Sequence, residues 1–258
     1  MDTISRLRNH MEFLKLYRMR DALDTELAEA EKQNLGVPTV LERLFSTEAA
    51  ALTERRIDRR IRESKLDERK LLDDFDFQFQ TGLDKSQIMS LAELGFVERN
   101  QWLVLAGCSG TGKSHIAKAL LLICCKKMYR CRYTTASDML RTLMSGLADD
   151  TLEQKLKLYV RPQVLLIDEI GFDRLEQESS ANAALFFKVI EGRYCKNPTI
   201  LTTNIDFQTM GDYLGDPVIT ASLVDRMVHH AIIISIDGPS WRMHESQVLN
   251  SLAERRKK

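Results

Sequence analysis

Apolar residues recur at helical spacing over residues 3 to about 75. A period near 3.6 residues places every third or fourth side chain on one face of a helix. The positions that form this stripe are Leu7, Met11, Leu14, Arg18, Leu23, Leu27 and Ala30. The run Gly36-Val37-Pro38 is a helix stop. The pattern predicts a small all-helical N-terminal domain over residues 1–75.

Two more helices are predicted within this domain. Thr39 and Glu42 have the spacing of a capping box and open a helix toward Phe45. A long charged helix follows from about Thr47 to Asp73. The next residues, up to Leu83, mix aromatic and acidic side chains and favour an extended connector. We therefore predict a connector and entry segment over 76–99 and a second domain over 100–258.

The pattern changes after about Asn100. Short β-branched or Leu-rich runs alternate with amphipathic helices, as in a parallel sheet with helical crossovers. The runs predicted as strands are Trp102–Ala106, Arg132–Thr135, Val164–Ile167, Thr199–Thr203 and Ile232–Ile236. These five strands predict an α/β domain.

Composition and charge exclude several classes of protein. Hydrophobic residues make up 44% of the 258, which is too many for a disordered chain. No apolar run near the N-terminus or elsewhere is long enough for a signal peptide or a membrane span, so we expect a cytoplasmic protein with no membrane partner. The five cysteines include no C-x-x-C pair and indicate reduced, mostly buried thiols. Because 37 basic and 37 acidic residues cancel, net charge does not argue for or against nucleic acid.

The segment from Gly107 to Ser114 is the strongest chemical signal. It matches G-x-x-x-x-G-K-[ST] between a predicted strand and a predicted helix, the context of a phosphate-binding Walker A loop. Glycines let backbone N–H groups turn toward phosphates, Lys113 supplies a cation to the β- and γ-phosphates, and Ser114 offers a hydroxyl to Mg²⁺. An ordinary Gly-rich turn would not explain Lys113-Ser114 in register. The predicted ATP-binding residues are Gly107, Cys108, Ser109, Gly110, Thr111, Gly112, Lys113, Ser114 and His115.

Two other predicted strands end in polar side chains. Asp168 and Glu169 end an apolar strand 55 residues after Lys113. In a Walker B arrangement Asp168 is the Mg²⁺-side carboxylate, and Glu169 polarises the attacking water. Asn204 ends the strand that begins at Thr199 and is predicted to hold that water or sense the γ-phosphate. Acids and Asn also terminate strands for purely structural reasons, so these roles depend on the Walker A loop.

Arg226 lies just before the last predicted strand. From there it is predicted to reach the γ-phosphate bound to a neighbouring subunit, where a guanidinium offsets transition-state charge. The alternative is a structural ion pair with Asp225 or a helix end. The adjacent His229 and His230 have no third ligand at useful spacing and do not indicate a metal site.

With these motifs the sequence resembles the DnaC/IstB-like branch of the AAA+ ATPases, and within it the IstB-type helper ATPases of insertion-sequence transposition. The segments that carry the resemblance are residues 16–23, residues 55–60, the Walker A loop, Leu166 to Gly171, Gly215-Asp216-Pro217, Leu223 to His229 and Gly238 to Arg242. The resemblance implies an AAA+ P-loop core in which Asn204 is sensor 1, Arg226 is the arginine finger and Arg242 is a second γ-phosphate sensor.

Two features depart from the family pattern. Trp241-Arg242-Met243 stands where the family more often has Tyr or Met, then Arg, then Lys or Leu. Only 22 residues follow Ile236, too few for the full C-terminal helical lid of ordinary AAA+ proteins.

An arginine-rich segment precedes the connector. Residues 55 to 70 hold eight Lys/Arg against four Asp/Glu, and positions 55, 59 and 62 share one helix face. Such a stripe contacts DNA phosphates without reading bases. The alternative is a solvated face paired with Asp58, Glu63 and Asp67.

Together these features predict an ATPase, with DNA-stimulated turnover, that forms homo-oligomers on duplex DNA and activates or targets a partner transposase. A DnaC-like replicative helicase loader would share every nucleotide residue named. A small-molecule kinase and a non-hydrolysing ATP-binding adaptor are the rival classes.

Overall fold

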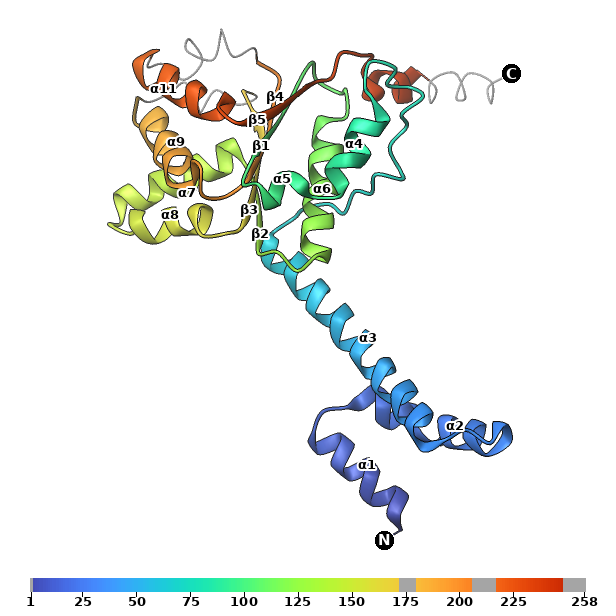
Figure 1. The fold of residues 1–258 in the computed structure, drawn as a ribbon. Coiled ribbons are helices and arrows are strands. Elements are labelled where there is room, and N and C mark those ends of the chain that lie inside the picture. Colours follow the sequence, from blue (N-terminus) through green and yellow to red (C-terminus); the bar gives the residue numbers. More distant parts are fainter. Residues whose placement is uncertain (1, 172–179, 206–216, 248–258) are drawn as a thin grey trace, which may run out of the picture. The chain divides into compact units, whose positions relative to one another are not determined.

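The computed structural model describes residues 2–171, 180–205 and 217–247. The chain divides into two compact units, Met1–Arg59 and Arg60–Lys258. The division falls inside a helix, and the boundary expected near residue 75 therefore lies within the second unit. Figure 1 shows the ribbon of both units.

The first unit consists of helices. They are α1 (Thr3–Phe13), α2 (Tyr17–Gln33) and the N-terminal part of α3 (Val37–Ser64). Asp2 caps α1 by accepting a hydrogen bond of 2.7 Å from the backbone N–H of Ser5. Asn34, in the left-handed region at φ 52°, ends α2. A small apolar core forms from Met11, Met19, Leu23, Val40 and Leu44.

Buried Glu48 of α3 caps the start of α2. Its carboxylate accepts hydrogen bonds from the backbone N–H groups of Arg18, at 2.8 Å, and Met19, at 3.1 Å. It also pairs with the guanidinium of Arg55 at 2.7 Å. Burial opposes ionisation of Glu48, but these three donors lower its pKa below the usual glutamate value. A side chain from a distant turn thus satisfies N–H groups that α2 leaves without a helical partner.

The helix boundaries correct three sequence-based predictions. The chain breaks between α1 and α2 at residues 14–16, inside the predicted continuous stretch. α3 runs without interruption from Val37, because Pro38 lies in the first turn, where a missing N–H costs nothing. α3 ends at Ser64 and not at Asp73, and Lys65 follows in the left-handed region at φ 60°.

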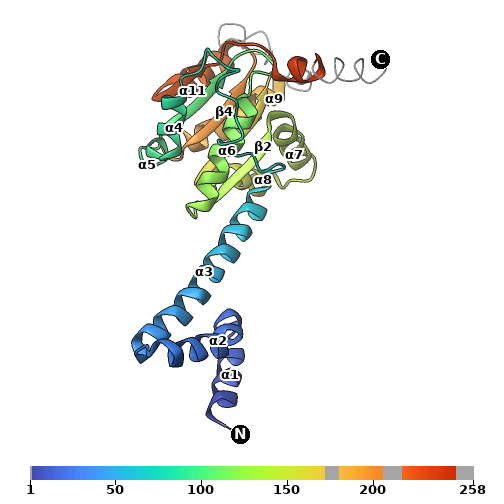
Figure 2. The same ribbon diagram turned by 90° about the vertical axis from the view of Figure 1, so that its right-hand side faces the viewer.

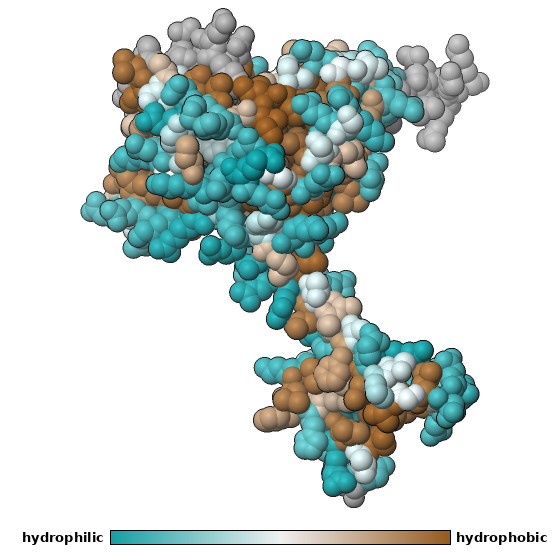
Figure 3. All heavy atoms as spheres, viewed as in Figure 1, coloured by the Kyte–Doolittle hydropathy of each residue, from teal (hydrophilic) through white to brown (hydrophobic). Residues whose placement is uncertain are grey.

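Large apolar side chains remain exposed on the first unit. Those more than half exposed are Phe13, Leu14, Val37 and Phe45. Figure 3 shows apolar residues gathered on the surface of α1 to α3. Exposed apolar surface of this kind is typical of a contact with another protein.

The second unit is built on a five-stranded parallel sheet. Its strands are β1 (Trp102–Ala106), β2 (Cys131–Thr135), β3 (Val164–Ile170), β4 (Thr199–Thr203) and β5 (Ala231–Ser235). The strand order is β2-β3-β4-β1-β5, and every pairing is parallel. The predicted fold class is confirmed. β2 starts one residue early, β5 both starts and ends one residue early, and β3 ends three residues late.

Helices cover both faces of this sheet (Figures 1 and 2). α6 (Lys113–Lys126) lies on one face with α4 (Lys85–Ala92) and α5 (Gly95–Glu98). On the other face are α7 (Ala136–Ala148), α8 (Leu152–Val160), α9 (Ser180–Arg193) and α11 (Pro217–Val228). Because both faces are covered, the central strands are buried almost throughout, and β3 begins with five buried residues.

Fully buried Arg193 ties the start of two strands together. Its guanidinium donates to the carbonyl oxygens of Tyr159, Val160, Pro162, Gln163 and Pro198, and to the hydroxyl of Thr199. Carbonyl oxygens and one hydroxyl thus replace water around a buried cation. This cluster fixes the chain entering β3 and β4, the two strands that carry the predicted acids and Asn204.

Three of the five cysteines are buried, Cys124, Cys125 and Cys131, and all five are free thiols, as predicted. No helix in the described part of the chain combines the length and the apolar character needed to cross a bilayer.

Candidate functional site

The Walker A loop connects β1 to α6, as the motif predicts. Gly112 stands directly before α6 at φ 96°, in the region that favours glycine. A Cβ at this position would lie 2.4 Å from Cε2 of Phe75, so the loop packs closely against that ring. Phe75 belongs to residues 65–83, which lie between α3 and α4 in the structure and form the connector as it is observed. The first turn of α6 then directs its unpaired N–H groups and the positive end of its dipole toward the loop.

Lys113 folds back over this loop. Its ammonium donates hydrogen bonds of 2.7 Å to the carbonyl oxygens of Gly107 and Cys108. Burial lowers the pKa of Lys113, while the negative charge of Asp168 partly restores it. The mostly buried ammonium therefore stands where phosphate oxygens on the loop would meet it.

Ser114 and Asp168 meet at the centre of the site. The hydroxyl of Ser114 donates 2.8 Å to Oδ1 of Asp168, and the hydroxyl of Thr202 on β4 donates 2.5 Å to the same atom. Asp168 is only 1% exposed. A hydroxyl beside a buried carboxylate is the donor set that Mg²⁺ takes in P-loop ATPases, so the residues fit the metal.

An irregularity in β3 sets the orientation of Glu169. The β3–β4 register shifts between Ile167 and Ile170, and Glu169 has a positive φ of 61°. Its backbone N–H donates 2.9 Å to the hydroxyl of Thr202. Burial and the adjacent Asp168 raise the pKa of Glu169. A bulge that presents a carboxylate of raised pKa to a cavity is suited to accepting a proton from water.

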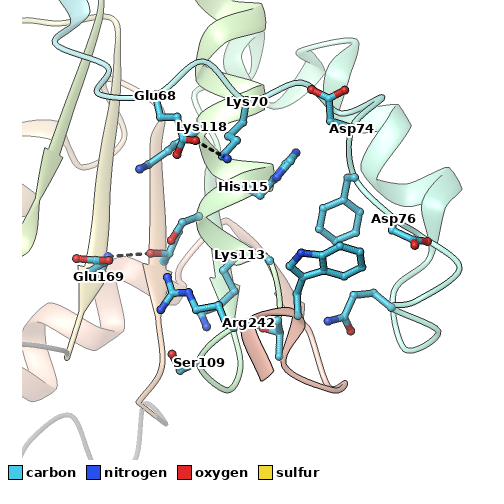
Figure 4. Close-up of a pocket in the computed structure, with 18 of the residues that line it drawn as sticks. Glu68, Lys70, Asp74, Asp76, Ser109, Lys113, His115, Lys118, Glu169 and Arg242 are labelled. Atoms are coloured by element: carbon cyan, nitrogen blue, oxygen red, sulfur yellow. Dashed lines mark hydrogen bonds and ion pairs between the residues drawn. The ribbon is translucent and has the colours of Figure 1, made fainter. Parts of the chain in front are cut away.

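A cavity of about 620 Å³ joins these residues. Ser109 to Ser114, His115, Glu169, Asn204 and Arg242 all line it. Figure 4 shows Lys113 and Arg242 directed into the same space, with Glu169 opposite. The positive charge of Arg242 adds to the lowering of the pKa of Lys113 and offsets part of the rise in the pKa of Glu169. The structure thus brings both predicted sensor side chains to the Walker A loop, and Arg242 reaches it from the helical residues 241–247.

The connector forms a wall of the cavity that the sequence analysis missed. The lining residues from it are Glu68, Arg69, Lys70, Asp74, Phe75, Asp76, Phe79 and Gln80. His115 holds this wall through a contact of 2.7 Å between Nε2 and the carbonyl oxygen of Leu71. Phe79 packs edge-on against Trp241, with ring centroids 5.0 Å apart. The available signal was the alternation of Phe75, Phe77 and Phe79 with acidic and Gln residues, which indicated an extended segment but not what this segment would pack against.

The cavity fits a nucleoside triphosphate. Its size suits a nucleotide, its loop supplies backbone donors and a lysine, and its other wall supplies the aromatic rings of Phe75, Phe79 and Trp241. Aromatic rings stack readily on nucleobases. The phosphate side and the base side of a nucleotide would therefore each meet suitable groups.

Arg226 is not part of this cavity. It lies in the last turn of α11, with its guanidinium 4.8 Å from the ring centroid of Phe187 and 5.7 Å from that of Tyr194. It donates 2.9 Å to the carbonyl oxygen of Ser222. Among the described residues, Arg226 therefore contacts the two aromatic rings and Ser222. These contacts do not include the ion pair with Asp225 that the sequence offered as a structural alternative.

The arginine-rich helix has ion pairs along its length. Arg55 pairs with Glu48, and Arg60 pairs with Glu63 at 3.4 Å. Asp67, considered as a partner of this stripe, pairs instead with Lys118. The residues that the structure describes contain no group of three or more His, Cys, Asp or Glu side chains placed to hold a metal among themselves. Gly215, Asp216 and the basic residues 255–258 lie outside the described residues.

Comparison with known proteins agrees with this geometry. The family model described as "IstB-like ATP binding protein" matches residues 9–248. A protein of insertion sequence IS232 from Bacillus thuringiensis subsp. berliner, named for ATP binding, is 32% identical over 95% of this chain and 96% of its own. Its counterpart from IS5376 of Geobacillus stearothermophilus is 33% identical over 94% of this chain and 96% of its own length.

Solved structures share the fold of the second unit. The DnaI structure has a TM-score of 0.55 at 24% identity and covers 66% of this chain and 92% of that one. The DnaC helicase loader has a TM-score of 0.50 at 24% identity and covers 59% and 87%. The fold is therefore the α/β fold of AAA+ P-loop proteins.

Proposed function

Because the chain belongs to the IstB-like ATP-binding protein family, we propose that it is an ATPase helper of insertion-sequence transposition. In this proposal it assembles with ATP into homo-oligomers on duplex DNA and activates or targets a partner transposase. The observation that carries the ATPase part is the convergence of Lys113, Ser114 and Glu169 on one cavity, with buried Asp168 hydrogen-bonded to Ser114. The relatives, named for insertion sequences, support the transposition part.

Each of the predicted site residues has a distinct role in ATP hydrolysis. Lys113 neutralises the β- and γ-phosphates, and Ser114 and Asp168 would hold Mg²⁺, which would supply further positive charge to the phosphate oxygens when bound. Glu169 accepts a proton from the attacking water, which Asn204 helps to orient. Arg242 adds positive charge on the γ-phosphate side. These roles need little movement, since Lys113, Ser114, Glu169, Asn204 and Arg242 already line the cavity and Asp168 is hydrogen-bonded to Ser114.

Arg226 acts on a neighbouring copy of the chain. The rings of Phe187 and Tyr194 hold its guanidinium away from the cavity of its own chain. A guanidinium delivered by the next subunit would make hydrolysis depend on assembly. ATP binding then favours the oligomer, and hydrolysis releases it.

DNA and the transposase are contacted by groups outside the cavity. The arginines of α3 supply positive charge for the DNA backbone, without base specificity. The exposed apolar residues of the first unit supply a surface for a second copy or for the transposase.

A helicase loader is the second candidate. It is supported by the fold shared with the structure named as the DnaC helicase loader. The two functions share the ATP site and differ in the protein that is bound. Capture of purified replicative helicase but not of transposase would favour the loader.

ATP turnover with and without duplex DNA tests the proposal. We expect DNA to stimulate turnover and ATP to produce rings or filaments on DNA in electron micrographs. Glu169→Gln should bind ATP and reduce turnover by about 10² or more, since it removes the proton acceptor. Glu153→Gln, an exposed change on α8, is the matched control. Monomers that hydrolyse ATP at the same rate without DNA, or that phosphorylate a small metabolite, would contradict the proposal.

A further inference from the structure

Lys118 lies between two carboxylates that belong to different parts of the second unit. Its ammonium is 2.8 Å from Oδ2 of Asp67, in the connector, and 4.0 Å from Oδ2 of Asp168, at the Walker B position. It also lies over the ring of Tyr133, at 5.0 Å from the centroid. The Tyr133 hydroxyl donates 3.1 Å to the same oxygen of Asp67. Four side chains thus form one contiguous cluster beside the ATP site.

The charge of Lys118 is poorly screened by solvent. Its side chain is 11% exposed, whereas that of Asp67 is half exposed. An exposed ion pair contributes little, but a mostly buried ammonium acts strongly on charges within a few ångströms. The charge of Lys118 also acts on Glu169, the other Walker B acid, because it offsets part of the rise in the pKa of Glu169.

Asp67 lies in the segment that follows α3 in the second unit. It stands three residues after Ser64, the last residue of α3, at the start of the segment that walls the cavity. Its contact with Lys118 therefore ties the segment that follows α3 to the helix that begins at the Walker A loop.

We propose that the Asp67–Lys118 pair couples Mg²⁺ binding at Asp168 to docking of the connector. This inference rests on the proposed Mg²⁺-dependent ATP site. A dication at Asp168 repels the ammonium of Lys118, and Asp67 compensates that repulsion by holding the ammonium on the connector side. Coupling is reciprocal, so Mg²⁺ strengthens the Asp67–Lys118 contact and with it the docking of residues 65–83.

This coupling predicts that two substitutions have opposite effects on Mg²⁺ binding. Lys118→Met removes the cation near Asp168 and should strengthen Mg²⁺ binding. Asp67→Asn leaves the cation without its compensating charge and should weaken Mg²⁺ binding. A purely structural role, in which either change merely loosens the connector, would move both variants in the same direction.

The first measurement is the factor by which millimolar Mg²⁺ tightens binding of a fluorescent ADP analogue. Using this ratio cancels any loss of nucleotide affinity that is independent of the metal. We expect it to rise roughly threefold or more in Lys118→Met and to fall by a similar factor in Asp67→Asn. Controls are Lys126→Met, an exposed lysine of the same helix, and Asp73→Asn, an exposed acid of the connector. In the double variant, Asp67→Asn should add no effect to that of Lys118→Met.

The second measurement needs no hydrolysis. Hydrogen exchange over residues 65–83 should slow on adding Mg²⁺ to the complex with a non-hydrolysable ATP analogue, and this slowing should disappear in Lys118→Met. Shifts of equal sign in the two single variants, or an unchanged Mg²⁺ response of the connector in Lys118→Met, would overturn the inference. A protein that shows the coupling but fails to turn over ATP would retain the inference and lose the proposed function.

Discussion

The hydroxyl of Ser114 donates a hydrogen bond of 2.8 Å to Oδ1 of Asp168, although 54 residues separate them. The first residue belongs to the start of α6 and the second to the end of β3, so the contact joins the Walker A and Walker B elements directly. Thr202 of β4 donates to the same carboxylate oxygen. Three elements of the sheet domain therefore converge on one buried charge.

Ser114→Ala should weaken the effect of Mg²⁺ on nucleotide binding. The variant keeps the carboxylate but loses the hydroxyl that would share the metal, and we expect the Mg²⁺-dependent gain in affinity to fall roughly tenfold or more. Titration of a fluorescent ATP analogue with and without Mg²⁺ measures it. Ser109→Ala, in the same loop and on the same cavity, is the control. Equal losses in the two variants would argue against a metal role for Ser114.

Phe75→Ala should weaken nucleotide binding without unfolding the protein. Phe75 lines the cavity and packs against Gly112, so its removal takes away part of the connector wall. A loss of one ring contact with a base corresponds to roughly 1–3 kcal/mol of binding free energy. Phe77→Ala is the matched control, because Phe77 contacts Phe75 but does not line the cavity. Equal nucleotide affinities for Phe75→Ala and the parent protein would show that Phe75 of the connector does not contribute to nucleotide binding.

Glu48→Gln should destabilise the first unit in a pH-dependent manner. The glutamine has lost the charge that accepts from Arg18, Met19 and Arg55, at a cost of about 1–3 kcal/mol for the weakened buried contacts. Because folding lowers the pKa of Glu48, its ionised form stabilises the folded state above the ordinary pKa of 4.5, and this contribution disappears as the pH falls through the lowered value.

Urea unfolding followed through the helical signal, at neutral pH and at successively lower pH, tests the role of Glu48. The difference in the free energy of unfolding between the parent and the glutamine variant should shrink on acidification. Glu54→Gln on the same helix, at an exposed position, should show no such difference. If the difference in the free energy of unfolding stays constant with pH, the charge of Glu48 does not stabilise the first unit.

Arg193→Met should destabilise the second unit by about 3 kcal/mol or more, because several buried carbonyl oxygens would lose their donor. Arg161→Met removes an exposed arginine a short distance before β3 and should have little effect. The midpoint of urea unfolding distinguishes them. Similar midpoints for the two variants would contradict the role of Arg193 in holding the entries to β3 and β4.

Some features of the fold and the site follow from local sequence. Lys113 and Ser114 lie where the Walker A motif predicts, and β1 and β4 have their predicted bounds. These features depend on residues that are neighbours in the chain: apolar runs that bury a strand, glycines that allow a turn, and a helix that starts at a fixed distance from them. Asp168 and Asn204 were found for a related reason, since parallel strands end at the same edge of a sheet.

Other features depend on contacts between distant segments. The chain contains no local signal that Glu48 would cap α2, that Arg193 would bind carbonyl oxygens from two loops, or that Phe75 would pack on Gly112. Helical periodicity suggested a helix to Asp73, yet α3 ends at Ser64. By itself the sequence determined the five-stranded sheet, the phosphate loop and its acidic partners, because short-range patterns encode them. Only the tertiary structure decided that the connector walls the ATP site and that Asp67 pairs with Lys118, because packing and charge pairing depend on distance in space and not along the chain.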